Sequence, residues 1–149
     1  RRMTLIKTLD KKKYFDDYAH HPTEIKASLK ALRDLSSRRI IAVVQPHRFS
    51  RIKQTFDKFS KSFKNSDFVI VLPIYAAGET KIKHLNVNNL AINIQKNSKT
   101  KTLAVNNFKK VEDFLNDEVK KGETVIFMGA GNISELANNY VNNLGKEHV

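Results

Sequence analysis

Runs of apolar residues alternate along this chain with stretches in which apolar residues recur every three or four positions. Four short segments, 40–44 (IIAVV), 68–72 (FVIVL), 102–105 (TLAV) and 124–128 (TVIFM), are apolar at almost every position. Such runs are typical of strands that are covered on both faces of a sheet. Two more strands are predicted at 3–9 and 13–18, on either side of a polar turn.

The segments between the strands have the periodicity of helices. After Pro22, Ile25, Leu29, Leu32 and Leu35 follow at spacings of four, three and three, which predicts one buried helix face. The same reasoning predicts four further helices, whose buried faces are Ile52, Phe56, Phe59 and Phe63; Val87, Leu90, Ala91 and Ile94; Phe108, Val111, Leu115 and Val119; and Ile133, Leu136, Ala137, Tyr140, Val141 and Leu144.

This order of elements predicts an α/β protein with a Rossmann-like three-layer fold. Its sheet is mostly parallel, with helices on both faces and an antiparallel strand pair at the N-terminus. Ligands of such sheets bind beyond the carboxyl ends of the strands. The candidate site therefore comprises four loops, 16–21, 45–51, 73–79 and 129–132.

Length and composition limit the class of protein. The 149 residues, 40% hydrophobic and 28% charged, suit one globular domain over 1–149. The absence of cysteine excludes disulfides, thiol nucleophiles and zinc–thiolate sites. No apolar run approaches the roughly 18 residues of a membrane helix, and residues 1–13 (RRMTLIKTLDKKK) lack the continuous apolar core of a signal peptide, so we expect a soluble, cytoplasmic domain. Because it begins with Arg1 rather than Met, we treat the chain as a candidate fragment.

The net charge of +12 belongs almost entirely to the first half of the chain. Residues 1–64 contain 17 Lys and Arg against 6 Asp and Glu, whereas residues 65–149 contain 10 against 9. Lysines on solvated helix faces account for most of this charge. All seven arginines, however, lie at or before Arg51, and the guanidinium group suits carboxylate and phosphate recognition.

The first two loops contain the most informative polar residues. In DDYAHHPTE (16–24), His20 and His21 precede a helix whose N–H groups favour an anion, and Asp17 could accept from a ribose hydroxyl or hold a metal-bound water. In QPHRFSR (45–51), Ser50 is a plausible N-cap. Arg48, Arg51 and the neighbouring His47 stand where the helix dipole disfavours cations, which suggests a bound anion.

Each of these loops also has a purely structural interpretation. Asp16 and Asp17 could simply end the strand while one histidine caps the helix. The arginines could point into water or pair with Asp57 or Asp67. Two adjacent histidines cannot both face one metal in an extended segment, so no metal site is predicted.

The last two loops contain glycines. In IYAAGE (74–79), Gly78 permits a turn. Tyr75 and Glu79 flank this turn, and we assign neither residue a role. MGAGNI (128–133) resembles the start of a dinucleotide-binding motif, but Ser134 replaces its third glycine. We therefore expect its small residues to allow a close backbone approach. No phosphate-binding G-x-x-x-x-G-K-[ST] loop is present.

Taken in order, DDYAHHPTE, QPHRFSR, IYAAGE and MGAGNI resemble the C-terminal domain of the UDP-N-acetylmuramate–L-alanine ligases, within the Mur ligase family. The likeness extends over essentially the whole chain. It implies a bacterial cytoplasmic enzyme of peptidoglycan synthesis whose N-terminal domain holds the UDP-sugar and whose central domain holds ATP and Mg²⁺, both absent from this chain. In that family ATP activates the lactyl carboxylate as an acyl phosphate, which the amine of L-alanine attacks.

The resemblance also implies roles for individual residues. His20, Arg48 and Arg51 would line the amino-acid subsite as the catalytic set, with the arginines neutralising the alanine carboxylate. Tyr18 and His47 would be neighbouring substrate-binding residues, and the nucleotide ribose would be bound by Asp17. One departure is Ala19, where many members have glycine, which leaves the local backbone angle open.

Two alternatives remain. A related recycling ligase, which attaches a whole murein peptide to UDP-N-acetylmuramate, shares the HHP segment but resembles this chain less at the arginine-bearing loop. A basic module that binds nucleic acid would account for the charge, but no aromatic-rich strand face or glycine-punctuated RNA-binding motif supports it. We expect no nucleic-acid or membrane partner and no ligase activity from this chain alone.

Overall fold

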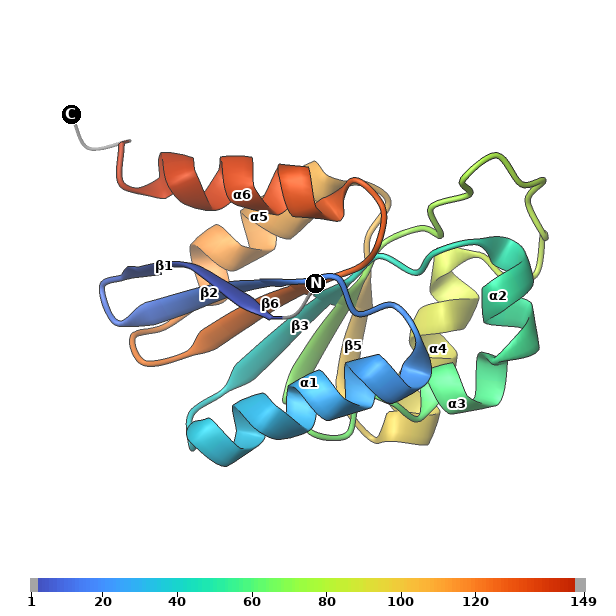
Figure 1. Cartoon of the computed structure of the whole chain (residues 1–149), viewed down its shortest axis with the longest axis horizontal. Helices are drawn as coiled ribbons and strands as arrows, with labels where there is room; N and C mark the ends of the chain where they lie inside the picture. The colour runs from blue at the N-terminus through green and yellow to red at the C-terminus, as the bar shows by residue number, and fades with distance from the viewer. Residues whose placement is uncertain (1–2, 147–149) are drawn as a thin grey trace.

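Six strands form one mixed sheet in a computed structural model that describes residues 3–146 (Figure 1). The order across the sheet is β1-β2-β6-β3-β4-β5, and only β1 and β2 pair antiparallel within it. The predicted mostly parallel sheet is therefore confirmed. Arg1 and Arg2 lie outside the described residues. The strands are β1 (Thr4–Leu9), β2 (Lys12–Asp17), β3 (Ile40–Val44), β4 (Phe68–Val71), β5 (Lys101–Ala104) and β6 (Thr124–Met128).

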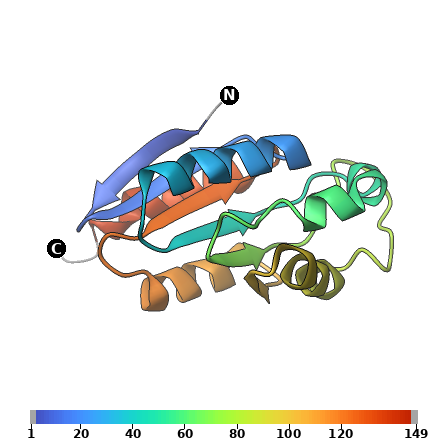
Figure 2. The ribbon, with the colours of Figure 1, turned by 90° about the horizontal axis from the view of Figure 1, so that it is seen from below.

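Helices cover both faces of this sheet (Figures 1 and 2). The helices are α1 (Pro22–Leu35), α2 (Phe49–Gln54), α3 (Phe56–Ser60), α4 (Val87–Ser98), α5 (Phe108–Glu118) and α6 (Ile133–Leu144). Alternate residues of β3 belong to two cores. Ile40, Ala42 and Val44 pack with residues of α1 to α4, whereas Ile41 and Val43 pack with residues of α5 and α6. The three-layer arrangement is thus confirmed.

One predicted helix is divided in two. The apolar pattern from Ile52 to Phe63 predicted one continuous helix, but α2 ends at Gln54 and α3 begins at Phe56. Between them, the Thr55 hydroxyl donates to the carbonyl of Arg51 at 2.8 Å, a contact that competes with regular helix geometry. Phe63 lies beyond α3 but is fully buried, as predicted.

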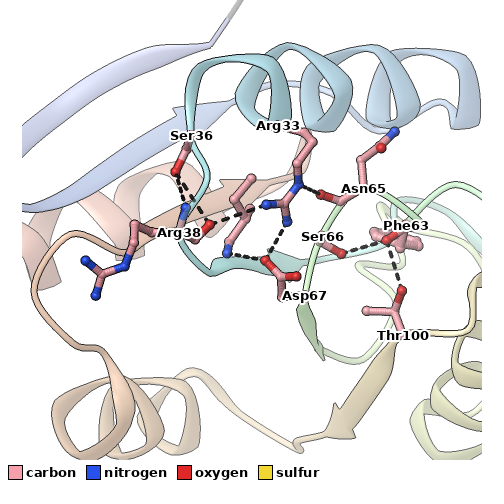
Figure 3. A network of polar contacts seen from close by, with 9 residues as sticks. Arg33, Ser36, Arg38, Phe63, Asn65, Ser66, Asp67 and Thr100 are labelled. Atoms are coloured by element: carbon pink, nitrogen blue, oxygen red, sulfur yellow. Dashed lines mark hydrogen bonds and ion pairs between the residues drawn. The ribbon is translucent and has the colours of Figure 1, made fainter.

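A polar network ties α1 to the amino edge of the sheet (Figure 3). Arg33 donates from Nε to the carbonyl of Asn65 at 3.2 Å and pairs with the carboxylate of Asp67, which also accepts from the Ile40 amide at 2.8 Å. The network fixes where the helix ends relative to β3. Leu35, predicted to be buried, is 80% exposed because it is the last residue of α1, where the chain turns toward β3.

The strand register brings the four candidate loops to one edge. Asp17, the last residue of β2, lies opposite Met128 of β6, which in turn lies opposite Val44 of β3. Val44 pairs with Val71 of β4. Four parallel strands therefore end level with one another, and the loops that follow them meet. Within residues 3–146, no helix is long and apolar enough to cross a membrane.

Candidate functional site

A row of aromatic rings joins three of the four loops. The rings of Tyr18 and His20 lie 5.3 Å apart, edge to face, and His20 lies 5.7 Å from His47. His47 stacks on Tyr75 at 5.7 Å with an interplanar angle of 9°. Tyr18, His20 and His47, predicted as site residues from separate motifs, therefore do come together.

Arg51 contacts this row through His20. Its Nη1 lies 3.0 Å from His20 Nε2. A guanidinium can only donate, so Nε2 accepts and the proton of the neutral imidazole is on Nδ1, which donates to the carbonyl of Tyr18 at 3.0 Å. The charge of Arg51 has no carboxylate partner among residues 3–146. The site thus contains one uncompensated cation held by a neutral partner.

The second site arginine, Arg48, pairs with Glu79 and not with Asp57 or Asp67. Its Nε and Nη2 lie 3.1 and 3.0 Å from Glu79 Oε2. The prediction that Ser50 is the N-cap is also wrong, because Arg48 is the N-cap of α2. Ser50 instead donates its amide to Glu79 Oε1 at 2.9 Å and its hydroxyl to Glu79 Oε2. These hydrogen bonds from Ser50, together with Arg48, lower the pKa of Glu79 below its ordinary value.

The two adjacent histidines have different roles. His21 is the N-cap of α1, where its Nδ1 accepts from the Thr23 amide at 3.3 Å. The Glu24 carboxylate accepts from the amides of His20 and His21, which completes a capping box. Burial alone would raise the pKa of Glu24, but these hydrogen bonds and the nearby histidines lower it overall. The structural interpretation therefore holds for His21, whereas His20 faces Arg51.

The two aspartates at the end of β2 also differ. Asp16 accepts from the Ser134 hydroxyl and from Asn138, so it anchors α6. Asp17 is 2% exposed; its Oδ1 accepts from the Ala19 amide at 2.9 Å, and its buried Oδ2 has no partner within the described chain. Ala19 does not have a positive φ, so this loop does not require glycine there.

Comparison with known proteins identifies the family. The sequence profile of the Mur ligase, glutamate ligase domain, matches residues 1–131. The chain belongs to the Mur ligase family. A UDP-N-acetylmuramate–L-alanine ligase of Fusobacterium nucleatum is 47% identical over 122 residues, and one of Chelativorans sp. is 39% identical over 137 residues. These matches cover 82% and 92% of this chain but only 25% and 30% of the relatives.

The fold of this Mur ligase chain is also found in solved structures. A murein peptide ligase of Psychrobacter arcticus superimposes with a TM-score of 0.78 at 22% identity, over 97% of this chain and 30% of that one. At this identity the likeness shows the fold and does not distinguish substrates.

The glycine turn of this Mur ligase domain packs against Gln45, a residue directly after β3 whose role the sequence did not indicate. Buried Gln45 donates from Nε2 to Asn132 at 2.8 Å and accepts from the Ile133 amide at 3.3 Å. A Cβ on Gly131 would lie 2.6 Å from Gln45 Oε1 and 2.7 Å from the Tyr75 ring. The close approach expected at this motif is confirmed, and it serves a neighbouring loop. A polar residue directly after a fully apolar strand was the available signal.

Glu79 is the second functional candidate to which the sequence assigned no role, since its partners lie about 30 positions earlier. Gly78, by contrast, adopts the turn predicted for it, with φ +87°. Among the described residues, no group of three or more His, Asp or Glu side chains is arranged to hold a metal ion.

We predict that His47 stays neutral at pH 7 and titrates below 6.5. Burial lowers the pKa of His47, and the nearby His20, Arg51 and Arg48 lower it further. Because the folded pKa lies below the unfolded one, the unfolded chain binds the proton more readily, and stability should fall as pH decreases through 6.5. Titration of the imidazole signal by NMR measures this, and an ordinary pKa would contradict it.

Proposed function

We propose that this chain is the C-terminal domain of a bacterial, cytoplasmic ligase that joins L-alanine to UDP-N-acetylmuramate in peptidoglycan precursor synthesis. The observation that carries the proposal is that Arg51 contacts His20 and that both Arg51 and Arg48 lie close to the His47 ring at the carboxyl edge of the sheet. Cations placed there suit the carboxylate of an amino acid. The relatives that match most of the chain bear the name of this activity.

In this proposal the domain binds and orients the amino acid. The central domain would hold ATP and Mg²⁺, and ATP would supply the phosphoryl group that activates the lactyl carboxylate. Arg51 and Arg48 hold the alanine carboxylate, and His20 fixes the direction of Arg51 through Nε2. The amine is thereby aimed at the activated carbonyl, and closure over the other two domains excludes water. The rings of Tyr18 and His47 pack edge to face against the His20 ring and would line the same subsite.

Asp17 is the proposed contact to the nucleotide ribose. Its unpartnered Oδ2 can accept one more hydrogen bond, which a ribose hydroxyl would donate. Because this atom is buried, the contact requires a small movement of the residues that cover it. A buried carboxylate oxygen without a donor is unfavourable, and a ligand hydroxyl would remove that penalty.

The isolated chain should have no ligase activity. It lacks the phosphate-binding loop that would hold ATP. Incubation with ATP, UDP-N-acetylmuramate and L-alanine is therefore expected to release no phosphate above background. Phosphate release that depends on both other substrates would contradict the proposed division of labour between domains.

The proposal itself is tested with a chimeric ligase. The corresponding C-terminal part of the Fusobacterium nucleatum enzyme is replaced by this chain, and product formation is followed with L-alanine or a murein peptide as the acceptor. Activity with L-alanine supports the proposal. Activity with the murein peptide alone would assign the chain to the recycling ligases. A chimera without its C-terminal part is the negative control.

A further inference from the structure

We infer that Glu79 is a positioning residue that holds the Arg48 guanidinium in the direction needed to receive the substrate carboxylate. This inference rests on the proposed function and extends it to a residue outside the proposed catalytic set. It starts from the contacts of the Glu79 carboxylate, which joins the loop after β4 to the loop after β3.

Both carboxylate oxygens of Glu79 are engaged. Oε1 accepts from the Ser50 amide at 2.9 Å, and Oε2 accepts from the Ser50 hydroxyl and from Arg48 Nε at 3.1 Å. The Nη2 of Arg48 also lies 3.0 Å from Oε2. Glu79 therefore binds the Nε and Nη2 edge of the Arg48 guanidinium. Its Nη1 makes no hydrogen bond within residues 3–146 and is left for a ligand.

Backbone hydrogen bonds between the loops after β3 and β4 also hold Arg48 in place. Arg48 has a φ of 71° and a ψ of 126°, a conformation that a residue with a side chain rarely adopts. It is held there by its amide, which donates to the carbonyl of Tyr75 at 2.8 Å. Tyr75 in turn donates its amide to Pro46 at 2.8 Å. A local strain stabilised from two loops is typical of functional sites.

The turn before Glu79 places its carboxylate. Ala77 and Gly78 have φ values of 51° and 87°, and the Glu79 amide donates to the carbonyl of Ala76 at 3.0 Å. The chain therefore reverses direction immediately before Glu79 and points its side chain back toward α2. Among the described residues, Glu79 is the carboxylate that pairs with Arg48.

The ion pair with Glu79 also gives the two arginines different net charges in their surroundings. Arg48 and Glu79 form a neutral pair, so the net positive charge near the rings comes from Arg51. Arg48 then contributes a fixed donor, whereas Arg51 contributes the charge. Removal of the Glu79 charge should not abolish binding but should let the Arg48 side chain rotate away.

The first test measures the hydrogen bond between Arg48 Nε and Glu79 in the 149-residue chain. Glu79→Gln keeps the size of the side chain and an acceptor for the Ser50 amide but replaces one oxygen with an N–H donor that cannot accept from Arg48. In NMR spectra, the Arg48 Nε–Hε signal should shift and exchange faster with water in the variant. An unchanged signal would overturn the inference.

The second test uses the chimeric ligase. Glu79→Gln is expected to raise the KM for L-alanine by about five- to twentyfold, with kcat and the KM for ATP within about twofold. The matched control is Glu112→Gln, on α5, whose side chain has no ion pair or hydrogen bond within the described chain. This control should leave all three parameters unchanged.

A double variant separates positioning from a general structural role. If Glu79 acts through Arg48, then Arg48→Ala with Glu79→Gln should have the same KM for L-alanine as Arg48→Ala alone. A further increase in the double variant would overturn the inference. An inactive unsubstituted chimera would instead refute the proposed function, and the NMR test would then decide whether Glu79 fixes Arg48.

Discussion

Replacing Arg51 by alanine is expected to raise the KM for L-alanine by roughly 10- to 150-fold in the chimeric ligase, which corresponds to about 1.5–3 kcal/mol for a hydrogen bond to a charged group. Arg51 has no carboxylate partner among the described residues and is held by the neutral imidazole of His20. A substrate carboxylate would therefore interact with the full positive charge of Arg51. The kcat should change less than the KM, because the interaction is already made in the ground state.

Two further variants test whether charge or geometry is responsible. Arg51→Lys retains the charge but lacks the planar fork, so its KM should lie between those of the parent and Arg51→Ala. Lys53→Ala removes an exposed cation two residues further along and should leave the KM unchanged. The assignment fails if Arg51→Ala has the parent KM, or if Lys53→Ala weakens L-alanine binding equally.

The fold could be predicted because each inner strand is covered on both faces. Burial on both sides leaves no room for polar positions, so segments such as 40–44 and 124–128 differ from every other part of the chain. Their parallel order then requires the following loops to meet at one edge. Tyr18, His20, His47 and Arg51 could be placed together for this reason, although their contacts could not.

The remaining features depend on contacts between distant residues. Glu79 reaches Arg48 across 31 positions, and Gln45 reaches Asn132 across 87. Neither residue has a local pattern that indicates its partner. His20 and His21 show a different limit, since identical side chains in adjacent positions take separate roles according to the direction of each ring.

The largest loss of stability is expected from Phe59→Ala, which should lower the free energy of unfolding by about 3–5 kcal/mol. Phe59 is fully buried in the core beneath α3, with its ring 5.4 Å from that of Phe63, edge to face. The substitution removes a large apolar side chain and leaves a cavity in a region already closed by α4. Unfolding of the 149-residue chain in urea measures the loss as a lower midpoint.

Phe56→Ala is the matched comparison, because the apolar pattern placed Phe56 and Phe59 on one buried helix face. In the structure Phe56 begins α3 and is only partly buried against the same core. Its side chain already borders an open surface groove near Lys53 and His84, so its removal creates little enclosed volume. We therefore expect a clearly smaller loss than for Phe59→Ala, with an unchanged urea dependence in both variants. Equal losses would mean that Phe56 is as deeply buried in the core as Phe59, which would contradict its partly buried position at the start of α3.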